Sequence, residues 1–332
     1  MTATSTDSTT PSALSPTEDW SLPTFLGDKR SHFPGYLWEP FLPKQSVVML
    51  AADAFSGKSM FCLGLGLALA EGGTFLGSPV VQANVLYVGV DSPQWDYGTQ
   101  VRKLLAGRKP PAGFHFLPEP FRLLDRGWRA RIGAYIQAHA IQLVVLDTLR
   151  AMHDKQENDS ADMQLIMSEM RAIGTEYGVT VLFLHHRPKP NEGKQSGYRG
   201  STVIEDSADV FVSMTAQAVG ADASLLTLRC PKGRGVKARS PMSVKLIWDD
   251  DAGTAFLSLA DWRAAKPVRS LETAVDARLA KGPATMEELV DEVPADGRAR
   301  KTIRNKVDAY LQRKRKAGIV VNEHGKVVHP EH

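Results

Sequence analysis

Short, continuous apolar runs recur between residues 46 and 186 of the chain, separated by polar or glycine-containing segments. The runs are rich in Val, Ile and Leu, which is typical of strands buried on both faces, and they occupy residues 46–51, 84–91, 141–150 and 179–186. Between them, the pattern predicts helices over residues 93–106, 129–139 and 160–177. Strands that alternate with helices in this way indicate an α/β fold with a mostly parallel sheet.

Three of these runs carry ionisable side chains at their ends. The second ends in Asp91, the third has Asp147 directly after four apolar residues, and the fourth ends in His185 and His186. The carboxyl ends of parallel strands meet at one edge of a sheet. We therefore expect these side chains to lie together in the crevice where open α/β folds bind ligands.

The segment after the first run nearly matches a phosphate-binding loop. Residues 50–60 read LAADAFSGKSM, whereas the strict pattern G-x-x-x-x-G-K-[ST] has glycine at the place of Ala52. A GKS triplet can occur by chance in a surface loop. Here it lies between a predicted strand and an apolar helix that ends at Gly72 and Gly73, which is the order that such a loop requires. The residues expected to contact the nucleotide are Ala54, Phe55, Ser56, Gly57, Lys58, Ser59 and Met60.

ATP and Mg²⁺ are the cofactors that this loop predicts. Its backbone N–H groups and the start of the helix hold phosphate oxygens, Lys58 reaches the β and γ phosphates, and the Ser59 hydroxyl binds Mg²⁺. Asp147 has the position of a Walker B aspartate, which holds the hydration shell of Mg²⁺ from the end of a neighbouring strand. Ser59 and Asp147 are therefore the expected metal ligands.

The composition is ordinary for a soluble globular protein. The chain has 332 residues and a net charge of +3, so affinity for nucleic acid must come from local clusters of charge. Its two cysteines, Cys62 and Cys230, suit a reducing cytosol, and the expected location is the cytoplasm. No apolar run predicts a membrane span. Residues 1–20 are rich in Ser, Thr and Pro and are expected to be a disordered tail rather than a signal peptide.

The chain changes character near Ala264. Residues 21–263 form the predicted ATPase core, residues 264–270 a linker, and residues 271–332 a small domain. Three helical stretches and a two-strand hairpin in the small domain resemble a winged helix, whose third helix lies in the major groove of duplex DNA. A solvated charged face and a protein-docking role are the alternatives. The basic residues expected to contact DNA are Arg300, Lys301, Arg304 and Lys306.

From about Trp38 to Asp261 the chain resembles the RecA-type ATPases of the AAA_25 group, which include the RepA-like hexameric replicative helicases of plasmids. The resemblance rests on four blocks of sequence: WEPFLPKQSVVMLAADAFSGKS, GSPVVQANVLYVGVDS, VVLDTLRAM, and VLFLHHRPKP followed by GYRGSTVIEDSADVFVSM. It implies a RecA-like P-loop fold and a homo-oligomer, namely a hexameric ring.

The resemblance assigns roles to the ends of two strands. Asp91 matches the carboxylate that activates the attacking water, although the family usually has glutamate there; alternatively, Asp91 caps the helix that begins near Pro93. His185 and His186 match the position that senses the γ-phosphate and couples it to a DNA-facing loop. Adjacent strand residues point to opposite faces, and His185 is favoured for the phosphate side. The alternative is that either histidine is structural.

The resemblance also implies contacts away from the phosphate-binding loop. Residues 187–200 lack periodicity and are expected to form a long loop in the ring channel, where Lys189, Lys194 and Arg199 contact single-stranded DNA. The alternative is a solvated loop without a partner. Lys232 and Arg234 match a K-x-R pair that reaches the nucleotide of the neighbouring subunit, as an arginine finger does; the alternative is a basic hairpin turn.

Two functions remain open. The first is an ATP-driven ring motor on DNA, a replicative helicase of a plasmid, phage or mobile element. The second is a nucleotide-switched DNA-binding or loading protein that separates no strands. Asp91 in place of glutamate, Ala52 in place of glycine and the extra C-terminal domain favour the second. A metabolic P-loop kinase is a more distant alternative, because the chain has no lid segment.

Overall fold

The computed structural model describes most of the chain outside its N-terminus and the regions around the predicted linker. The described residues are 19, 21–119, 122–186, 202–220, 222–234, 240–260, 275–276, 278–279, 282–292, 300–316, 321–323 and 326–328. The predicted disordered tail, apart from residue 19, and the predicted linker lie outside these residues, so both remain predictions.

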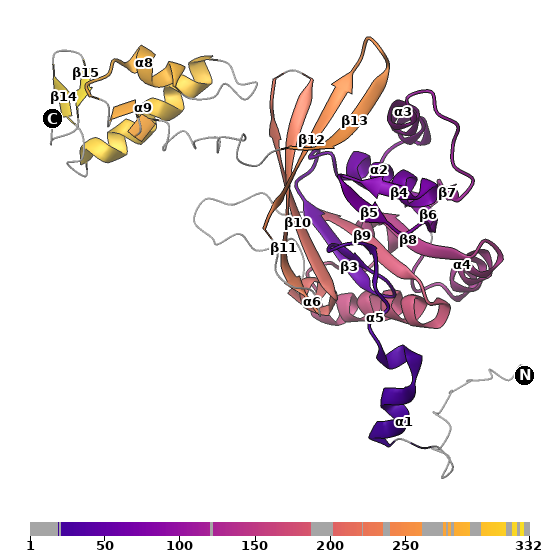
Figure 1. Cartoon of the computed structure of the whole chain (residues 1–332). Coiled ribbons are helices and arrows are strands. Elements are labelled where there is room, and N and C mark those ends of the chain that lie inside the picture. Colours follow the sequence, from indigo (N-terminus) through magenta and orange to yellow (C-terminus); the bar gives the residue numbers. More distant parts are fainter. Residues whose placement is uncertain are drawn as a thin grey trace, which may run out of the picture.

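A nine-stranded mixed sheet forms the centre of the larger unit (Figure 1). Its strand order is β13-β12-β11-β10-β3-β9-β8-β6-β7, and the strands from β10 to β7 run parallel. The strands β10 to β13 are joined in antiparallel pairs at the other edge. The bounds are β3 Val47–Ala52, β6 Asn84–Gly89, β7 Phe114–Leu117, β8 Ile141–Asp147, β9 Thr180–His186, β10 Val210–Ala218, β11 Ala223–Gly233, β12 Met242–Asp249 and β13 Thr254–Leu259. The prediction of an α/β fold with a mostly parallel sheet is confirmed.

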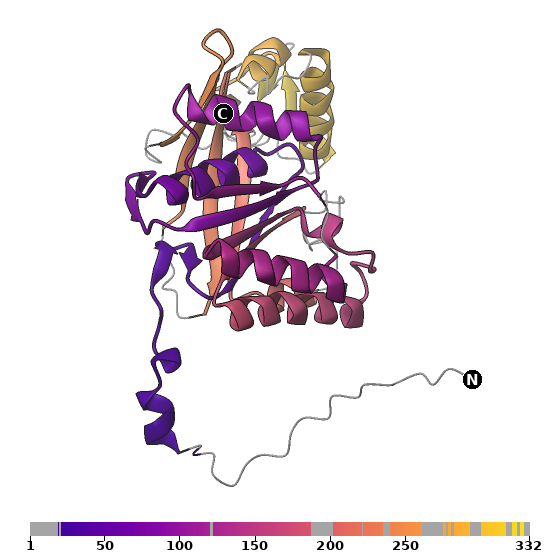
Figure 2. The ribbon, with the colours of Figure 1, turned by 90° about the vertical axis from the view of Figure 1, so that its right-hand side faces the viewer.

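Helices cover both faces of the parallel part of the sheet (Figure 2). The helices α2 (Lys58–Glu71) and α3 (Gln94–Leu105) pack on one face, and α4 (Arg126–Ala138) and α5 (Ser160–Tyr177) pack on the other. Alternate residues of β3 divide between the two cores: Val48, Leu50 and Ala52 face α2, whereas the residues between them face α5. A continuous apolar strand is therefore required here, as the sequence pattern indicated.

A second, small sheet covers one end of the α2 face. Its order is β2-β1-β5-β4, and its bounds are β1 Tyr36–Trp38, β2 Leu42–Pro43, β4 Gly73–Phe75 and β5 Ser78–Val80. The buried ring of Trp38 packs against Phe61 and Phe75 and joins this sheet to α2. The remaining elements of this unit are the helices α1 Leu22–Gly27 and α6 Thr202–Ser207 and the single 3-10 turns Lys29–Ser31 and Leu149–Met152.

The C-terminal residues have a core of their own. Residues 275–276 and 278–279 are helical, followed by α8 (Met286–Asp291) and α9 (Arg300–Lys316). The strands β14 (Val321–Glu323) and β15 (Lys326–Val328) pair as an antiparallel hairpin. The buried residues shared by these helices are Val275, Leu279, Leu289, Val290, Ile303, Val307, Tyr310 and Leu311. Helices followed by a hairpin agree with the predicted order of elements, and the winged-helix identity stays a prediction.

Within the described residues, no helix combines the length and the apolar character that a membrane crossing needs.

Candidate nucleotide-binding site

The loop between β3 and α2 has the shape that a phosphate-binding loop needs. Gly57 is the N-cap of α2 and has φ +80°, and a side chain there would also come within 3.1 Å of Leu246. This position therefore favours glycine both by conformation and by space. Ala52 is different, since it is fully buried in β3 and pairs with His186 as an ordinary strand residue. The missing first glycine thus introduces no strain at Ala52.

Lys58 opens α2 and is held at the carboxyl edge of the sheet. Its Nζ donates to the main-chain oxygen of Asp53 at 2.7 Å and lies 3.4 Å from that of Ala52. The side chain is almost completely buried, and this burial lowers the pKa of Lys58, while Asp147 and Asp91 oppose the shift. A partly desolvated ammonium group at the start of a helix is well placed to attract phosphate oxygens.

His186, rather than His185, faces the loop. Its Nδ1 lies 3.3 Å from Nζ of Lys58, and its Nε2 lies 3.5 Å from Oδ2 of Asp91. Along β9, Leu182 and Leu184 belong to the α2 core, so His186 continues that face, whereas His185 is buried on the side of α5. The structure therefore differs from the expectation that His185 faces the phosphates.

Asp91 follows β6 and lies outside α3. That helix begins after Pro93 and has no side-chain cap, so the alternative in which Asp91 caps it is not what the structure shows. A hydrogen bond from His186 is the main cause that lowers the pKa of Asp91, against a smaller opposing effect of burial. Asp91 is therefore an ionised, partly exposed carboxylate at the mouth of the site.

Asp147 ends β8 and lies deep in the site. Its Oδ2 accepts hydrogen bonds from the hydroxyls of Tyr87, at 2.6 Å, and Tyr97, at 3.1 Å. Its Oδ1 is buried and accepts no hydrogen bond from any residue that the structure describes. Burial raises the pKa of Asp147, while the hydroxyls of Tyr87 and Ser59 favour the ionised form.

Oδ1 of Asp147, which accepts no hydrogen bond from the described residues, is a suitable ligand for a magnesium ion. Mg²⁺ prefers oxygen ligands, and a buried carboxylate oxygen with no other partner is costly unless a cation or its water shell supplies one. Ser59 and Oδ1 of Asp147 would hold the ion, directly or through water. When bound, Mg²⁺ neutralises charge on the β and γ phosphates.

A cavity of about 740 Å³ joins these groups. Its walls are the loop residues 54–60, Asp91 and His186, together with one face of α3 and Trp248 of β12. All seven residues that were expected to contact the nucleotide thus line one cavity, and Asp147 lies buried behind it. No sequence pattern indicated the contributions of α3 and β12, which are Asp96, Thr99, Gln100, Lys103 and Trp248.

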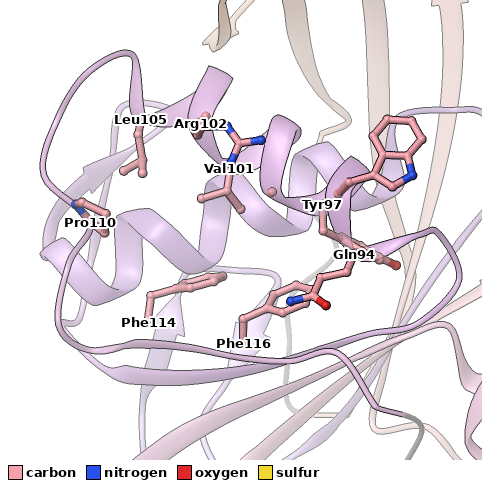
Figure 3. A pocket seen from close by; sticks show the side chains of 10 residues that line it. Gln94, Tyr97, Val101, Arg102, Leu105, Pro110, Phe114 and Phe116 are labelled. Carbon is pink, nitrogen blue, oxygen red and sulfur yellow. The ribbon is translucent and has the colours of Figure 1, made fainter.

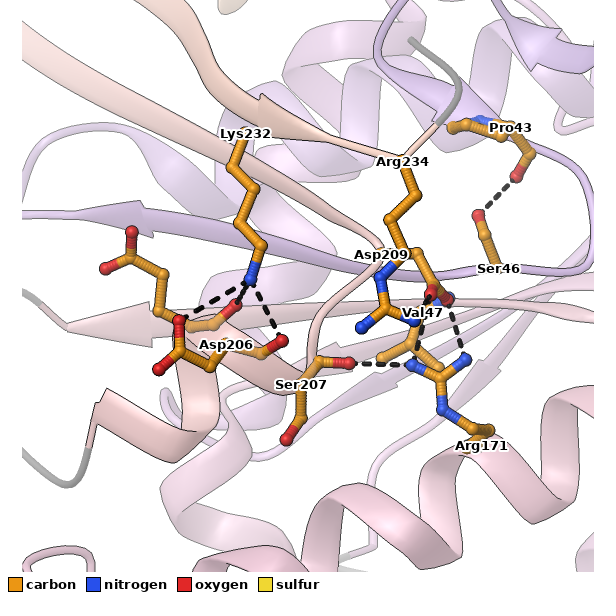
Figure 4. Close-up of polar contacts among 10 residues, drawn as sticks. Pro43, Ser46, Val47, Arg171, Asp206, Ser207, Asp209, Lys232 and Arg234 are labelled. Carbon is orange, nitrogen blue, oxygen red and sulfur yellow. Dashed lines mark hydrogen bonds and ion pairs between the residues drawn. The ribbon is translucent and has the colours of Figure 1, made fainter.

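The K-x-R pair makes contacts within its own chain (Figure 4). Nζ of Lys232 donates to the main-chain oxygens of Glu205 and Asp206, each at 2.9 Å. The guanidinium group of Arg234 lies 3.7 Å from Oδ1 of Asp209 and is about two-thirds exposed, at 63%. These contacts are at the surface, where ion pairs contribute little and open easily.

The strand register places Lys232 away from the loop of its own chain. Phe211 of β10 pairs with Lys232 on one side and with Met49 on the other, near the start of β3, whereas the phosphate loop follows Ala52 at its end. Three residues along a strand span about 10 Å, and β11 is also two strands away from β3. Neither Lys232 nor Arg234 lines the cavity around Lys58.

The basic residues of α9 are partly neutralised by α8. Arg300 pairs with Glu287 at 2.9 Å and with Asp291 at 2.6 Å, and Arg304 also pairs with Glu287. Lys306 is exposed. The side chain of Lys301 lies outside the described part of the chain, as do all of the loop residues Lys189, Lys194 and Arg199.

Comparison with known proteins identifies the family. The crystal structure of a KaiC-like protein from the hyperthermophilic archaeon Pyrococcus horikoshii OT3 resembles the chain with 15% sequence identity and a TM-score of 0.49, over 68% of this chain and 94% of that chain. The AAA domain that defines the AAA_25 family matches residues 16–192, which is just over half of the chain. With a nucleotide-binding loop, a Walker B aspartate and this match, the chain is a P-loop ATPase that belongs to the AAA_25 family.

Proposed function

We propose that this ATPase is a motor on DNA, a RepA-like replicative helicase of a plasmid, phage or mobile element that works as a hexameric ring. In this proposal, ATP binds in the cavity around Lys58 with Mg²⁺, single-stranded DNA binds residues 187–200, and duplex DNA binds the C-terminal domain. The resemblance of the sequence blocks to RepA-like helicases supports this choice within the family.

One observation carries the link between nucleotide and DNA. His186 contacts both Lys58 and Asp91 in the site, and it is the last residue of β9. The next residues in the sequence, 187–200, carry Arg187, Lys189, Lys194 and Arg199. In this proposal, His186 responds to the γ-phosphate and is covalently adjacent to the basic segment, so a shift of His186 on hydrolysis moves the start of that segment.

The proposed chemistry uses the charges that surround His186. Lys58 stabilises the charge that develops on the transferred phosphoryl group, and Mg²⁺ held by Ser59 and Asp147 would neutralise part of the same charge. The Asp91 carboxylate takes a proton from the attacking water as the water oxygen bonds to the γ-phosphorus and the bond to the β-phosphate oxygen breaks. Asp91 is one methylene shorter than glutamate, which shifts the position of the attacking water, and its lowered pKa makes it a weaker base. We therefore expect slow hydrolysis without DNA.

Assembly would complete the site. Lys232 and Arg234 lie away from the loop of their own chain, near the opposite end of β3. A residue in that place can approach a nucleotide only if the nucleotide belongs to another subunit. The exposed Arg234 is thus a candidate finger in trans, a role worth roughly 10³–10⁵ in rate in well-studied NTPases.

The second candidate is a nucleotide-switched DNA-binding protein that separates no strands. The weak base favours it, because a switch needs binding and slow hydrolysis rather than rapid turnover. In this case DNA would act through the C-terminal domain and not through residues 187–200. The two candidates therefore predict different effects of the same substitutions.

The discriminating experiment compares two variants, each of which loses three positive charges in a different part of the chain. One variant carries Lys189→Ala, Lys194→Ala and Arg199→Ala; the matched control carries Lys29→Ala, Lys109→Ala and Arg131→Ala at exposed positions of the core. ATP hydrolysis is measured with and without single-stranded DNA, and strand separation is measured on a forked duplex. The motor predicts that only the first variant loses stimulation and unwinding. No unwinding by the wild-type chain, or full stimulation of the first variant, would favour the switch.

A further inference from the structure

Tyr97 joins the carboxylate of Asp147 to the main chain of Asp91. Its hydroxyl donates to Oδ2 of Asp147 at 3.1 Å and accepts from the main-chain N–H of Asp91 at 3.3 Å. A tyrosine hydroxyl has one proton to donate and lone pairs to accept with, so both bonds form at once. Asp147 ends β8 and Asp91 follows β6, and the N–H of Val90 donates to the main-chain oxygen of Asp147 at 3.2 Å. Tyr97 of α3 adds a side-chain link between the same two segments.

We propose that Tyr97 is a positioning residue for ATP hydrolysis, which sets the place of the Asp91 loop relative to the Walker B aspartate. Asp91 lies outside the strands and helices, where its backbone depends on such contacts. Asp147 has two tyrosine donors on Oδ2, which leaves Oδ1 available for a magnesium ion or its water shell. A shift of the Tyr97 hydroxyl would therefore move the base and the metal ligand relative to each other. This inference rests on the ATPase site and not on the DNA-motor proposal.

The ring of Tyr97 is held by an aromatic cluster. Its centroid lies 5.2 Å from that of Phe116 and 6.1 Å from that of Tyr87. A side chain on Gly89 would come within 2.6 Å of Phe116 and 3.0 Å of the Tyr97 ring, so only glycine leaves room for the cluster at the end of β6. The hydroxyl is thus placed by packing as well as by its hydrogen bonds.

The same ring forms part of the wall of a second cavity, of about 660 Å³, between α3 and β7. Figure 3 shows side chains of α3 facing Phe114 and Phe116 across this space. The ring of Tyr97 therefore has apolar surroundings on one side and the two acidic residues at its hydroxyl end. Tyr97 therefore links the position of α3 to the two acidic residues, in addition to the residues of α3 that line the nucleotide cavity.

Tyr87 provides an internal comparison. Its hydroxyl donates to the same Oδ2 of Asp147, at 2.6 Å, but no hydrogen bond joins it to Asp91 among the described residues. If Tyr97 acts only by holding Asp147, Tyr87→Phe and Tyr97→Phe should have the same consequences. If Tyr97 positions Asp91, its loss should slow turnover beyond any change in metal-dependent binding.

The test compares Tyr97→Phe and Tyr87→Phe with Tyr135→Phe, which removes a hydroxyl far from the site. For each, the affinity for a fluorescent ADP analogue is measured with Mg²⁺ and with EDTA, together with kcat, KM and Tm. Loss of a hydrogen bond to a charged or catalytic group changes a rate or an affinity by about tenfold or more. We expect Tyr97→Phe to lower kcat by about tenfold, with KM and the EDTA affinity within about threefold of wild type. For Tyr87→Phe, we expect weaker Mg²⁺-dependent binding.

A second variant tests the position of the Tyr97 ring without removing its hydroxyl. Gly89→Ala keeps the Tyr97 hydroxyl but pushes the ring, and we expect it also to lower kcat more than nucleotide affinity. The proposal is overturned if folded Tyr97→Phe keeps kcat within about twofold of wild type, or if both tyrosine variants lose only Mg²⁺-dependent binding. A wild-type chain without ATPase activity would instead contradict the ATPase assignment itself.

Discussion

Nδ1 of His186, the last residue of β9, lies 3.3 Å from Nζ of Lys58, the first residue of α2. The register of these strands pairs His186 with Ala52, so the histidine stands beside the root of the phosphate loop. Because Nδ1 accepts from the lysine, the ring proton belongs on Nε2, which faces Asp91. The imidazole of His186 thus connects Lys58, which would neutralise phosphate charge, with Asp91, the proposed base.

Replacing this imidazole should reduce turnover while nucleotide still binds. In His186→Ala, Lys58 and the loop remain, so we expect nucleotide affinity within about threefold of wild type and kcat lower by at least about tenfold. His185→Ala is the matched control. This substitution leaves a cavity on the other face of β9. We expect it to lower the free energy of unfolding by about 1–3 kcal/mol, and therefore Tm, while kcat is largely kept. The reverse result, with His185→Ala alone losing turnover, would contradict this assignment.

The pKa of Asp91 gives a prediction with a defined sign. The His186 hydrogen bond lowers the pKa of Asp91 below the ordinary value of 3.8, so the carboxylate is still ionised when the pH reaches 3.8. The contribution of this carboxylate to folding stability is therefore lost only as the pH falls below 3.8. In His186→Ala, the pKa should rise toward 3.8, and protonation should begin at higher pH. A carboxyl ¹³C NMR titration of Asp91 in both proteins measures this. Equal pKa values would show that His186 does not act on Asp91.

The amide variant tests the role of the same residue in catalysis. Asp91→Asn keeps the shape of the side chain and loses the base, so nucleotide should bind normally and turnover should stop. The measurement is nucleotide affinity beside steady-state hydrolysis. Normal turnover in this variant would place the base elsewhere.

Much of the sheet could be predicted because its strands are buried on both faces. The runs that end in Asp91, Asp147 and His186 became β6, β8 and β9, and the helix over residues 160–177 has the predicted bounds. The strands β1, β2, β4 and β5 were not predicted. They have two or three residues each, too few for a period of two to be recognised.

The site could be predicted only where a residue type and its spacing are distinctive. Lys58, Ser59 and Asp147 follow from such patterns, whereas Tyr87 and Tyr97 look like ordinary core aromatics in an apolar strand and a helix. The choice between His185 and His186 failed for a related reason. Both faces of β9 are apolar and buried, so its sequence shows no alternation of apolar and polar residues. Without that alternation, the sequence does not indicate which face each histidine is on.

Subunit mixing tests whether Arg234 acts in trans. Lys58→Ala and Arg234→Ala subunits should each be inactive alone, and a mixture should recover part of the ATPase activity, because some interfaces then combine an intact loop with an intact finger. Hydrolysis is measured over a range of mixing ratios, with circular dichroism of both proteins as the control for folding. If no ratio restores activity, Arg234 acts in its own chain or lies outside the site.

Salt dependence tests the C-terminal domain. A truncation that ends at Arg269 should lower duplex affinity and flatten the plot of log affinity against log salt, by about one unit of slope for each lost phosphate contact. Arg300 and Arg304 already pair with acids of α8, so we expect the loss in slope to be smaller than the number of basic residues in α9. Nucleotide affinity should be unchanged. An unchanged duplex affinity and slope would remove duplex DNA as the partner of this domain.

The most direct test of the whole account is the rate of ATP hydrolysis by the full chain, measured with and without single-stranded DNA, in parallel with Lys58→Ala. The account predicts slow hydrolysis by the wild type alone, a rise of about tenfold or more with single-stranded DNA, and no activity above background for Lys58→Ala in either condition. Undiminished hydrolysis by Lys58→Ala would contradict the nucleotide site. A wild-type rate that does not respond to single-stranded DNA would contradict the motor.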